Sequence, residues 1–247
     1  MNDTCIEFDN VLAGYGEFMI LNNLSLKARR GKITLLLGPN GAGKSTVLKT
    51  LFGMLKVRQG RVRLDGQDIT GVSARELLLT RGIAFVPQGR NLFGQLTAYE
   101  NLELGGITLG MKTTRERIPE VLKLFPRIEQ RLHSAASSLS GGEQKQLEVG
   151  RALLLKPKVL LIDEPSIGLS PLVVQDVFKL LRRLADEGTT VLMVEQNVKS
   201  ALKVADEAIA LESGRLVLHK PAGELLNDPN IERLFLGGAH AATTATT

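Results

Sequence analysis

The chain has 247 residues, of which 43% are hydrophobic and 23% charged, a composition typical of a globular protein. It contains no apolar run near the roughly 18 residues that a membrane-spanning helix needs, so we expect a chain that is soluble by itself. The net charge of +5 comes from scattered basic residues, and because the densest cluster, KARRGK, lacks interleaved aromatic residues, we expect no nucleic-acid partner.

The chain begins with MNDTCIEFDN, which lacks the basic and apolar pattern of an export signal. The single cysteine, Cys5, cannot form an internal disulfide. We therefore expect the protein to work in the reducing cytoplasm.

The predicted elements fall into three blocks. Residues 1–85 contain runs typical of β-strands, namely CIEFDNVLAGY, LNNLSLKA, KITLLLG, GRVRLDG and GIAFV. Residues from about 90 to 150 have helical spacing, as in TAYENLELGG and TRERIPEVLKLF. From Lys158 onward strands and helices alternate, as in KVLLID, PLVVQDVFKLLRRLADEG, TTVLMVE, VKSALKVADEAIALESG and RLVLHK. The order predicts an α/β core with a mostly helical insertion between its halves.

The stretch GPNGAGKST lies between the apolar run ITLLL and the helix-like VLKTLFGML. It matches G-x-x-x-x-G-K-[ST], which binds phosphates between a strand and a helix. Gly38, Gly41 and Gly43 let the backbone turn so that N–H groups face an anion, at the positive end of the next helix. Lys44 would bind the β- and γ-phosphates, and the Ser45 hydroxyl would bind Mg²⁺. The alternative is a glycine turn with an incidental lysine. The predicted nucleotide-binding residues here are Gly38, Pro39, Asn40, Gly41, Ala42, Gly43, Lys44, Ser45 and Thr46.

The apolar run VLLI is followed by Asp163 and Glu164, at the carboxyl end of a predicted buried parallel strand. Asp163 would hold Mg²⁺, and Glu164 would polarise the attacking water as general base. Alone, the pattern fits equally a strand that ends in an acidic turn. Because the same chain also contains a complete phosphate-binding loop, the catalytic interpretation is favoured.

The stretch SSLSGGEQKQLEVGRALL predicts a capped helix. Ser140 is a favourable N-cap, and Glu143 completes a capping box. Gly141 and Gly142 would expose N–H groups at the positive helix end, which makes a second anion site. The simpler interpretation is that these glycines only lead into the helix. A second anion site in a chain that already has one indicates that two chains hold the nucleotide between them.

The segments LSGGE and GRALLLKPKVLLIDEP resemble the signature and magnesium-site region of ATP-binding-cassette ATPases, over nearly the whole chain. Members of that family are dimers in which ATP lies between one subunit's phosphate loop and the other's signature. The resemblance implies ATP and Mg²⁺ as cofactors, and adenine stacking on Tyr15. It also implies that Gln88 touches Mg²⁺ and water and relays the state of the site to a membrane partner. The residues implied to contact the partner subunit's ATP are Ser140, Gly141, Gly142 and Glu143.

Further strings are similar to the LivF-like branch of this family, namely VPQGRNLFGQLTAYENLELG, LFPRI, EPSIGLSP and VEQNVKSALKVADEAIALESGRLVL. That branch supplies one of two ATPase subunits of bacterial branched-chain amino-acid importers. Urea and short-chain amide importers carry a related subunit. The implied partners are a second, LivG-like ATPase subunit, transmembrane permease subunits and, indirectly, a solute-binding protein. The implied location is the cytoplasmic face of the inner membrane, where the chain would be peripheral.

Two positions depart from the common family pattern. Ser170 stands where an aspartate is usual, and Gln196 stands where most members have histidine. We expect Gln196 to face the γ-phosphate, so that the predicted catalytic residues are Glu164, Gln88 and Gln196. For Glu195 and Asn197, the neighbours of Gln196, the alternative is that they only cap the next helix.

The segment after Gln88 offers a partly apolar surface to a membrane subunit. Leu92, Phe93, Leu96 and Tyr99 would form it, and the alternative is that they belong to the core.

The predicted fold is α/β, a P-loop NTPase core sheet with an antiparallel β subdomain and an inserted α-helical subdomain. We expect one domain over residues 1–236, with residues 1–89 and 151–236 as core and about 90–150 as the helical subdomain. Residues 237–247 would be a disordered tail. The alternative functions are an ATPase subunit of a urea or amide importer and a non-transport ATP switch acting on DNA or ribosomes. An inactive structural partner is disfavoured by the intact Lys44, Asp163 and Glu164.

Overall fold

The structure, a computed structural model, describes residues 3–89 and 91–228. Its strands are β1 (Thr4–Tyr15), β2 (Phe18–Arg29), β3 (Ile33–Leu37), β4 (Val57–Leu64), β5 (Gln67–Asp68), β6 (Ile83–Val86), β7 (Val159–Asp163), β8 (Thr190–Val194), β9 (Glu207–Glu212) and β10 (Arg215–Pro221). Its α-helices are α1 (Lys44–Leu51), α2 (Ala74–Glu76), α3 (Ala98–Gly105), α4 (Met111–Leu122), α5 (Pro126–Gln130), α6 (Gly141–Leu153), α7 (Pro171–Asp186), α8 (Val198–Leu202) and α9 (Ala222–Leu226). Single turns of other helix types are η1 (Leu77–Arg81), η2 (Ile107–Leu109) and η3 (Ala136–Ser138).

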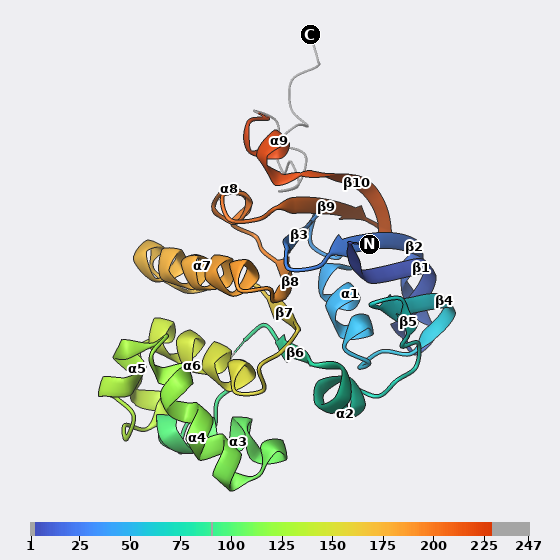
Figure 1. The fold of residues 1–247 in the computed structure, drawn as a ribbon. Coiled ribbons are helices and arrows are strands. Elements are labelled where there is room, and N and C mark those ends of the chain that lie inside the picture. Colours follow the sequence, from blue (N-terminus) through green and yellow to red (C-terminus); the bar gives the residue numbers. More distant parts are fainter. Residues whose placement is uncertain (1–2, 90, 229–247) are drawn as a thin grey trace.

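The strands form two sheets, both visible in Figure 1. The larger sheet has the order β10-β9-β3-β8-β7-β6, in which only β10 pairs antiparallel with its neighbour. The smaller sheet, β2-β1-β4-β5, is antiparallel throughout. Strands β3, β7 and β8 are buried along their whole length, as continuous apolar runs predict for a parallel sheet covered on both faces.

The segment between β6 and β7 is helical. It contains α3, α4, α5 and α6, and in its described residues the only β pairing is an isolated bridge between Thr97 and Ala135. In Figure 1 these helices lie together, away from the four-stranded sheet. The predicted fold class is therefore confirmed, with its α/β core, antiparallel β part and helical insertion.

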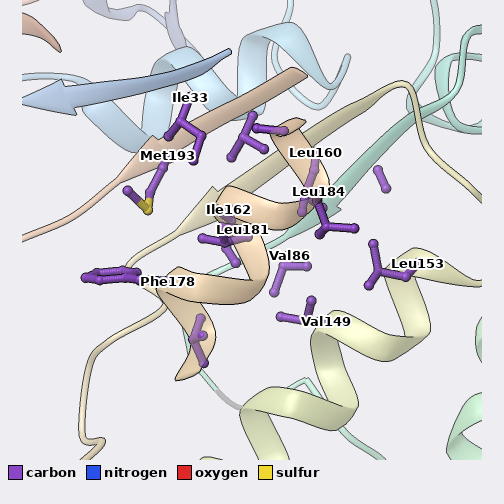
Figure 2. Close-up of a cluster of buried hydrophobic side chains, with 14 of the residues drawn as sticks. Ile33, Val86, Val149, Leu153, Leu160, Ile162, Phe178, Leu181, Leu184 and Met193 are labelled. Carbon is purple, nitrogen blue, oxygen red and sulfur yellow. The ribbon is translucent and has the colours of Figure 1, made fainter. Parts of the chain in front are cut away.

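Two hydrophobic clusters cover the faces of the larger sheet. Figure 2 shows the cluster beneath α7, where Phe178 and Leu181 of that helix lie near Ile162 of β7. Val149 and Leu153 of α6 belong to the same cluster. Shared packing of α6 and α7 connects the helical insertion to strand β7.

The C-terminal part of the chain differs in one respect from the expected order of elements, and its last residues lie outside the described part. Residues 198–214, which follow β8 in the expected alternation, hold both α8 and β9. The predicted tail, residues 237–247, and the end of the predicted domain at residue 236 lie outside the described residues. No helix in residues 3–89 and 91–228 is long and apolar enough to cross a bilayer.

Candidate functional site

The site is built at one edge of the larger sheet, where the parallel strands β3, β8, β7 and β6 end. Open α/β sheets bind ligands outside the carboxyl ends of their strands. Gly38 follows β3, Glu195 follows β8, Asp163 ends β7, and Gln88 lies two residues beyond β6. Strand order thus brings together polar residues that are far apart in the sequence.

The phosphate-loop backbone has the conformation that its glycines allow. Gly38 has φ 141°, Gly41 has φ 82°, and Gly43, the N-cap of α1, has φ 100°. These positive angles are rarely adopted by other residues. At Gly38 a Cβ atom would also lie 2.2 Å from the carbonyl oxygen of Leu211. Only glycine therefore fits at the start of the loop.

Lys44 is buried at the start of α1 and closes the loop on itself. Its Nζ donates hydrogen bonds to the carbonyl oxygens of Gly38 at 2.8 Å and of Pro39 at 3.0 Å. Burial lowers the pKa of the lysine, and the nearby charges of Glu164 and Asp163 oppose that shift. The ammonium is therefore held at the mouth of the loop, where the positive end of α1 also favours an anion.

Asp163 has the features of a cation ligand. Burial raises the pKa of its carboxyl group, the Ser45 hydroxyl lowers it, and the neighbouring Glu164 raises it. Its Oδ1 atom is buried and has no hydrogen-bond partner among the described residues. One carboxylate and one hydroxyl fit a Mg²⁺ ion that takes its remaining ligands from nucleotide phosphates and water. The described part of the chain contains no cluster of three or more acidic, histidine or cysteine residues that could hold a metal ion.

Glu164 is held by two glutamines that the sequence analysis assigned to the same site. Gln88 Nε2 donates to Oε2 of Glu164 at 2.6 Å, and Gln196 Nε2 donates to Oε1 at 2.7 Å. Glu164 itself has φ 50°, a left-handed conformation that is unfavourable for a residue with a side chain. Its backbone N–H donates to the carbonyl of Val194 at 2.9 Å, which ties the strained residue to β8. Strain that is retained in this way is common at catalytic positions.

Glu195 does not have the role that the sequence suggested. It is buried and accepts hydrogen bonds from the backbone N–H and the hydroxyl of Ser166, both at 2.7 Å. It also accepts hydrogen bonds from the backbone N–H groups of Gln196 and Asn197. Burial raises the pKa of its carboxyl group, although the hydrogen bonds act to lower it. Asn197 does cap α8, by accepting from the N–H of Ser200. Glu195 therefore fixes the segment that carries Gln196 against the one that follows Glu164.

A cleft of about 410 Å³ lies beside the phosphate loop, and Gly38, Asp163 and Glu195 are not part of its lining. Its lining is Tyr15, Ile20, Asn40, Gly41, Gly43, Lys44, Ser45, Thr46, Gln88, Glu164 and Gln196. Ile20 was not predicted, because a single apolar residue in a strand carries no local signal. A larger hollow of about 480 Å³ between α5, α6 and α7 contains none of the predicted site residues.

Tyr15 lies at the rim of the cleft with 44% of its surface exposed. The Nζ atom of Lys49 is 5.6 Å from the centre of the tyrosine ring and 3.3 Å from its hydroxyl. An exposed aromatic face at the rim suits a purine, and its stacking role remains a prediction.

The signature residues do not line this cleft. Ser140 caps α6 and forms the predicted capping box with Glu143. A Cβ atom on Gly142 would lie 2.7 Å from Val173, so this glycine is needed for packing against α7. A Cβ atom on Gly141 would meet nothing closer than 3.8 Å. Nothing within the described chain therefore requires a glycine at position 141.

The partly apolar surface after Gln88 is only partly exposed. Phe93 has 53% of its surface exposed. Leu92 and Tyr99 pack against the core cluster, and Leu96 is half-buried. Of these four residues, Phe93 alone projects strongly into solvent, so the core interpretation applies in part to the others.

Comparison with known proteins shows the family to which the chain belongs. The model of the ABC transporter family matches residues 21–167. The chain is 42% identical over 233 residues to the high-affinity branched-chain amino acid transport ATP-binding protein BraG of Pseudomonas aeruginosa, covering 94% of this chain and 100% of the relative. It is 39% identical over 226 residues to the probable branched-chain amino acid transport ATP-binding protein LivF of Archaeoglobus fulgidus, covering 91% and 95%.

A solved structure shares the fold. The crystal structure of the ADP conformation of MJ1267, an ATP-binding cassette of an ABC transporter, superimposes with a TM-score of 0.83 at 28% identity, covering 94% of this chain and 98% of that one. This chain therefore carries its phosphate loop, and the Glu164 that two glutamines hold, on a fold shared with that ATP-binding cassette. The chain belongs to the ABC transporter family and is one of its ATP-hydrolysing subunits.

Proposed function

We propose that the chain hydrolyses MgATP to drive an importer of branched-chain amino acids, to which it binds at the cytoplasmic face of the inner membrane. The hydrolytic role is carried by one observation. Two amides, from Gln88 and Gln196, hold both carboxylate oxygens of Glu164 at the cleft of the phosphate loop. The transport roles printed for BraG and LivF support the solute class.

In the proposed mechanism Glu164 is the general base. The oxygen of a water molecule bonds to the γ-phosphorus while the bond from that phosphorus to the bridging oxygen of ADP breaks. The proton released by the water passes to the Glu164 carboxylate, and ADP and phosphate leave. Lys44 and the N–H groups of the phosphate loop stabilise the charge on the phosphates. When bound by Asp163 and Ser45, Mg²⁺ would supply further charge stabilisation.

A second ATPase subunit is proposed to complete each site. Ser140 and Gly141 lie at the exposed start of α6, outside the chain's own cleft. No contact within the described chain requires a glycine at position 141. This supports the idea that another molecule, the nucleotide of the partner, comes close to the backbone there. We propose a LivG-like chain as that partner, with permease subunits docked near Phe93 and a solute-binding protein acting through them.

The proposal is tested by Glu164→Gln in a transporter complex, purified from membranes, whose partner ATPase subunit already carries the equivalent change, so that the measured turnover is that of this chain's site. A glutamine keeps the size of the side chain but cannot take the proton, so ATP binding should remain while turnover falls by about 10²- to 10⁴-fold. ATP-bound dimers should then accumulate, which gel filtration with MgATP can detect. Glu129→Gln, at an exposed position on α5, is the matched control and should keep normal turnover. Near-normal turnover of Glu164→Gln would show that the base is another group.

A comparison of the two single changes, Glu164→Gln here and its equivalent in the partner, tests the role of Gln196. A glutamine amide donates a hydrogen bond but cannot carry the charge that a histidine can. A lost charge-assisted hydrogen bond is worth about 1–3 kcal/mol, or about 10- to 100-fold in rate. We therefore expect Glu164→Gln here to lower turnover less than the equivalent change in a partner that keeps the histidine. Equal loss from both changes would mean that Gln196 is fully sufficient.

A further inference from the structure

Two side chains of α6 hold the backbone of the loop that carries Gln88. The N–H of Asn91 donates to Glu148 Oε1 at 2.8 Å. The carbonyl oxygen of Asn91 accepts from Arg151 Nη1 at 2.6 Å. Glu148 and Arg151 are three residues apart and share one face of the helix. Both hydrogen-bonding groups of the Asn91 backbone are therefore attached to α6.

Glu148 is itself held in one position. Its side chain is 5% exposed, and its Oε2 atom lies 2.6 Å from the Nζ of Lys145, which is 6% exposed. A buried ion pair gives little net stability, but its charges allow few alternative arrangements. Arg151 is further positioned over the ring of Phe93, 5.6 Å from its centre. The attachment of the loop to α6 is therefore well defined.

The side chain of Asn91 extends this attachment to Gln88. Its Nδ2 atom donates to the carbonyl oxygens of Pro87 at 3.4 Å and of Gly89 at 3.3 Å, on either side of Gln88. Gln88 in turn donates to Glu164 at 2.6 Å. Hydrogen bonds from α6 to Asn91, from Asn91 to the two carbonyl oxygens that flank Gln88, and from Gln88 to Glu164 thus connect the helix to the proposed general base.

We infer that Asn91 is a positioning residue that couples the location of α6 to the carboxylate of Glu164. The inference rests on the proposed function, in which Glu164 is the base and Ser140, at the start of α6, meets the nucleotide of the partner. When α6 moves to engage that nucleotide, the backbone of Asn91 moves with it, and the turn around Gln88 follows. Binding of α6 to the partner's nucleotide thereby aligns Glu164 at the nucleotide of this chain.

Asn91→Ala tests the coupling in the complete transporter complex, with the partner's equivalent of Glu164 replaced by glutamine so that kcat reports on this chain's site. Asn91 is exposed, so its loss should leave folding intact. The change removes two long hydrogen bonds but touches no residue that lines the cleft, so kcat should fall about 3- to 10-fold while the KM for ATP stays within about twofold. Asn91→Asp should have the same effect, because a carboxylate cannot donate to the two carbonyls. Unchanged kcat in both variants would overturn the inference.

Two further variants serve as controls on the route. Asn227→Ala removes a similar bond, from Nδ2 to the carbonyl of Gly223 at 3.1 Å, at the C-terminal end of α9, and should leave kcat unchanged. Arg151→Lys keeps the charge but loses the planar fork that reaches the Asn91 carbonyl, and should lower kcat without changing KM. If Asn227→Ala lowers kcat as much as Asn91→Ala does, the effect of the Asn91 change is not specific.

A double-mutant cycle with Gln88→Ala decides whether the effect passes through Gln88. In the Gln88→Ala background Asn91→Ala should change kcat by less than about twofold, because the last step of the route is already missing. If the fold-changes in kcat of Gln88→Ala and Asn91→Ala multiply in full, the inference is overturned. Glu164→Gln, measured alongside, separates the hypotheses. If it abolishes turnover while Asn91→Ala is normal, only the coupling fails, whereas near-normal turnover of Glu164→Gln rejects the proposed base and the coupling together.

Discussion

Asp163 shows at the scale of one residue how a ligand site lowers the stability of a fold. Its carboxylate is buried, and its Oδ1 atom has no hydrogen-bond partner among the described residues. Burial raises the pKa of the group above its value of 3.8 in the unfolded chain. The folded protein therefore holds the proton more tightly, and its stability falls as pH rises from the unfolded pKa to the folded one. At neutral pH the ionised group is a net cost unless a cation binds.

We predict that Asp163→Asn raises the free energy of unfolding at pH 7 by about 1 kcal/mol, because the buried charge is removed. The gain should shrink as pH falls towards the raised pKa of Asp163, where the native carboxyl is already neutral. The same variant should lose the Mg²⁺ dependence of ATP binding. Denaturant unfolding at pH 7 and pH 5, with nucleotide titrations with and without Mg²⁺, measures both effects. A variant that is less stable than the native chain at pH 7 would contradict this account.

Helix α6 is the element in which structural and functional roles overlap. Its capping box, formed by Ser140 and Glu143, has all of its bonds in the structure: the serine hydroxyl accepts from the N–H of Glu143, and the glutamate accepts from the N–H of Ser140. The box explains the serine and the glutamate by helix formation alone. It does not explain Gly141, whose surroundings would admit a larger residue. A functional role for the start of α6 therefore has to be separated from capping by experiment.

Ser140→Ala is predicted to cost about 1 kcal/mol of stability through loss of the cap, and to lower ATP turnover by more than about 10-fold through loss of the donor to the partner's nucleotide. Ser73→Ala is the matched control, because Ser73 caps α2 by accepting from the N–H of Glu76. It should lose a similar amount of stability and keep its turnover. Thermal unfolding and steady-state ATPase rates distinguish the two contributions. If both variants lose turnover in proportion to stability, Ser140 is only a cap.

At the scale of the whole molecule, the helical insertion and the core present a common surface beside the Gln88 loop. Phe93 is exposed there, and Arg151 of α6 lies over its ring. A membrane subunit that docks there would contact both α6 and the loop that reaches Glu164. Docking and hydrolysis would then be linked through the same residues.

Phe93→Glu is predicted to lower solute uptake by at least about 10-fold while ATP binding stays within about twofold, because a charge disrupts an apolar contact without entering the cleft. Val217→Glu, on the distant strand β10, replaces an apolar residue of nearly equal exposure, 52% against 53%, and should have no effect on uptake. Uptake into reconstituted vesicles and nucleotide binding are the two measurements. Normal uptake by Phe93→Glu would place the docking surface elsewhere.

Much of the fold and part of the site could be predicted from local sequence patterns. The phosphate loop was predicted because glycine angles, a following helix and Lys44 act over nine neighbouring residues. The buried strands β3 and β7 were predicted from their apolar runs, and the cap of α6 from the spacing of Ser140 and Glu143. The loop and the cap are stabilised by contacts within a few residues, and each strand is marked by its own apolar run, so these features can be read from the sequence by itself.

Tertiary structure alone decided how the distant residues meet. Gln88 and Gln196 lie 76 and 32 residues from Glu164 along the chain, and only the order of β6, β7 and β8 places their amides on its two carboxylate oxygens. The left-handed conformation of Glu164 has no sequence signal, because it is imposed by its bond to β8. The contact between Asn91 and Glu148 likewise depends on the packing of α6 beside the loop. Sheet order and helix packing arise from burial of many side chains together, so a local pattern does not contain them.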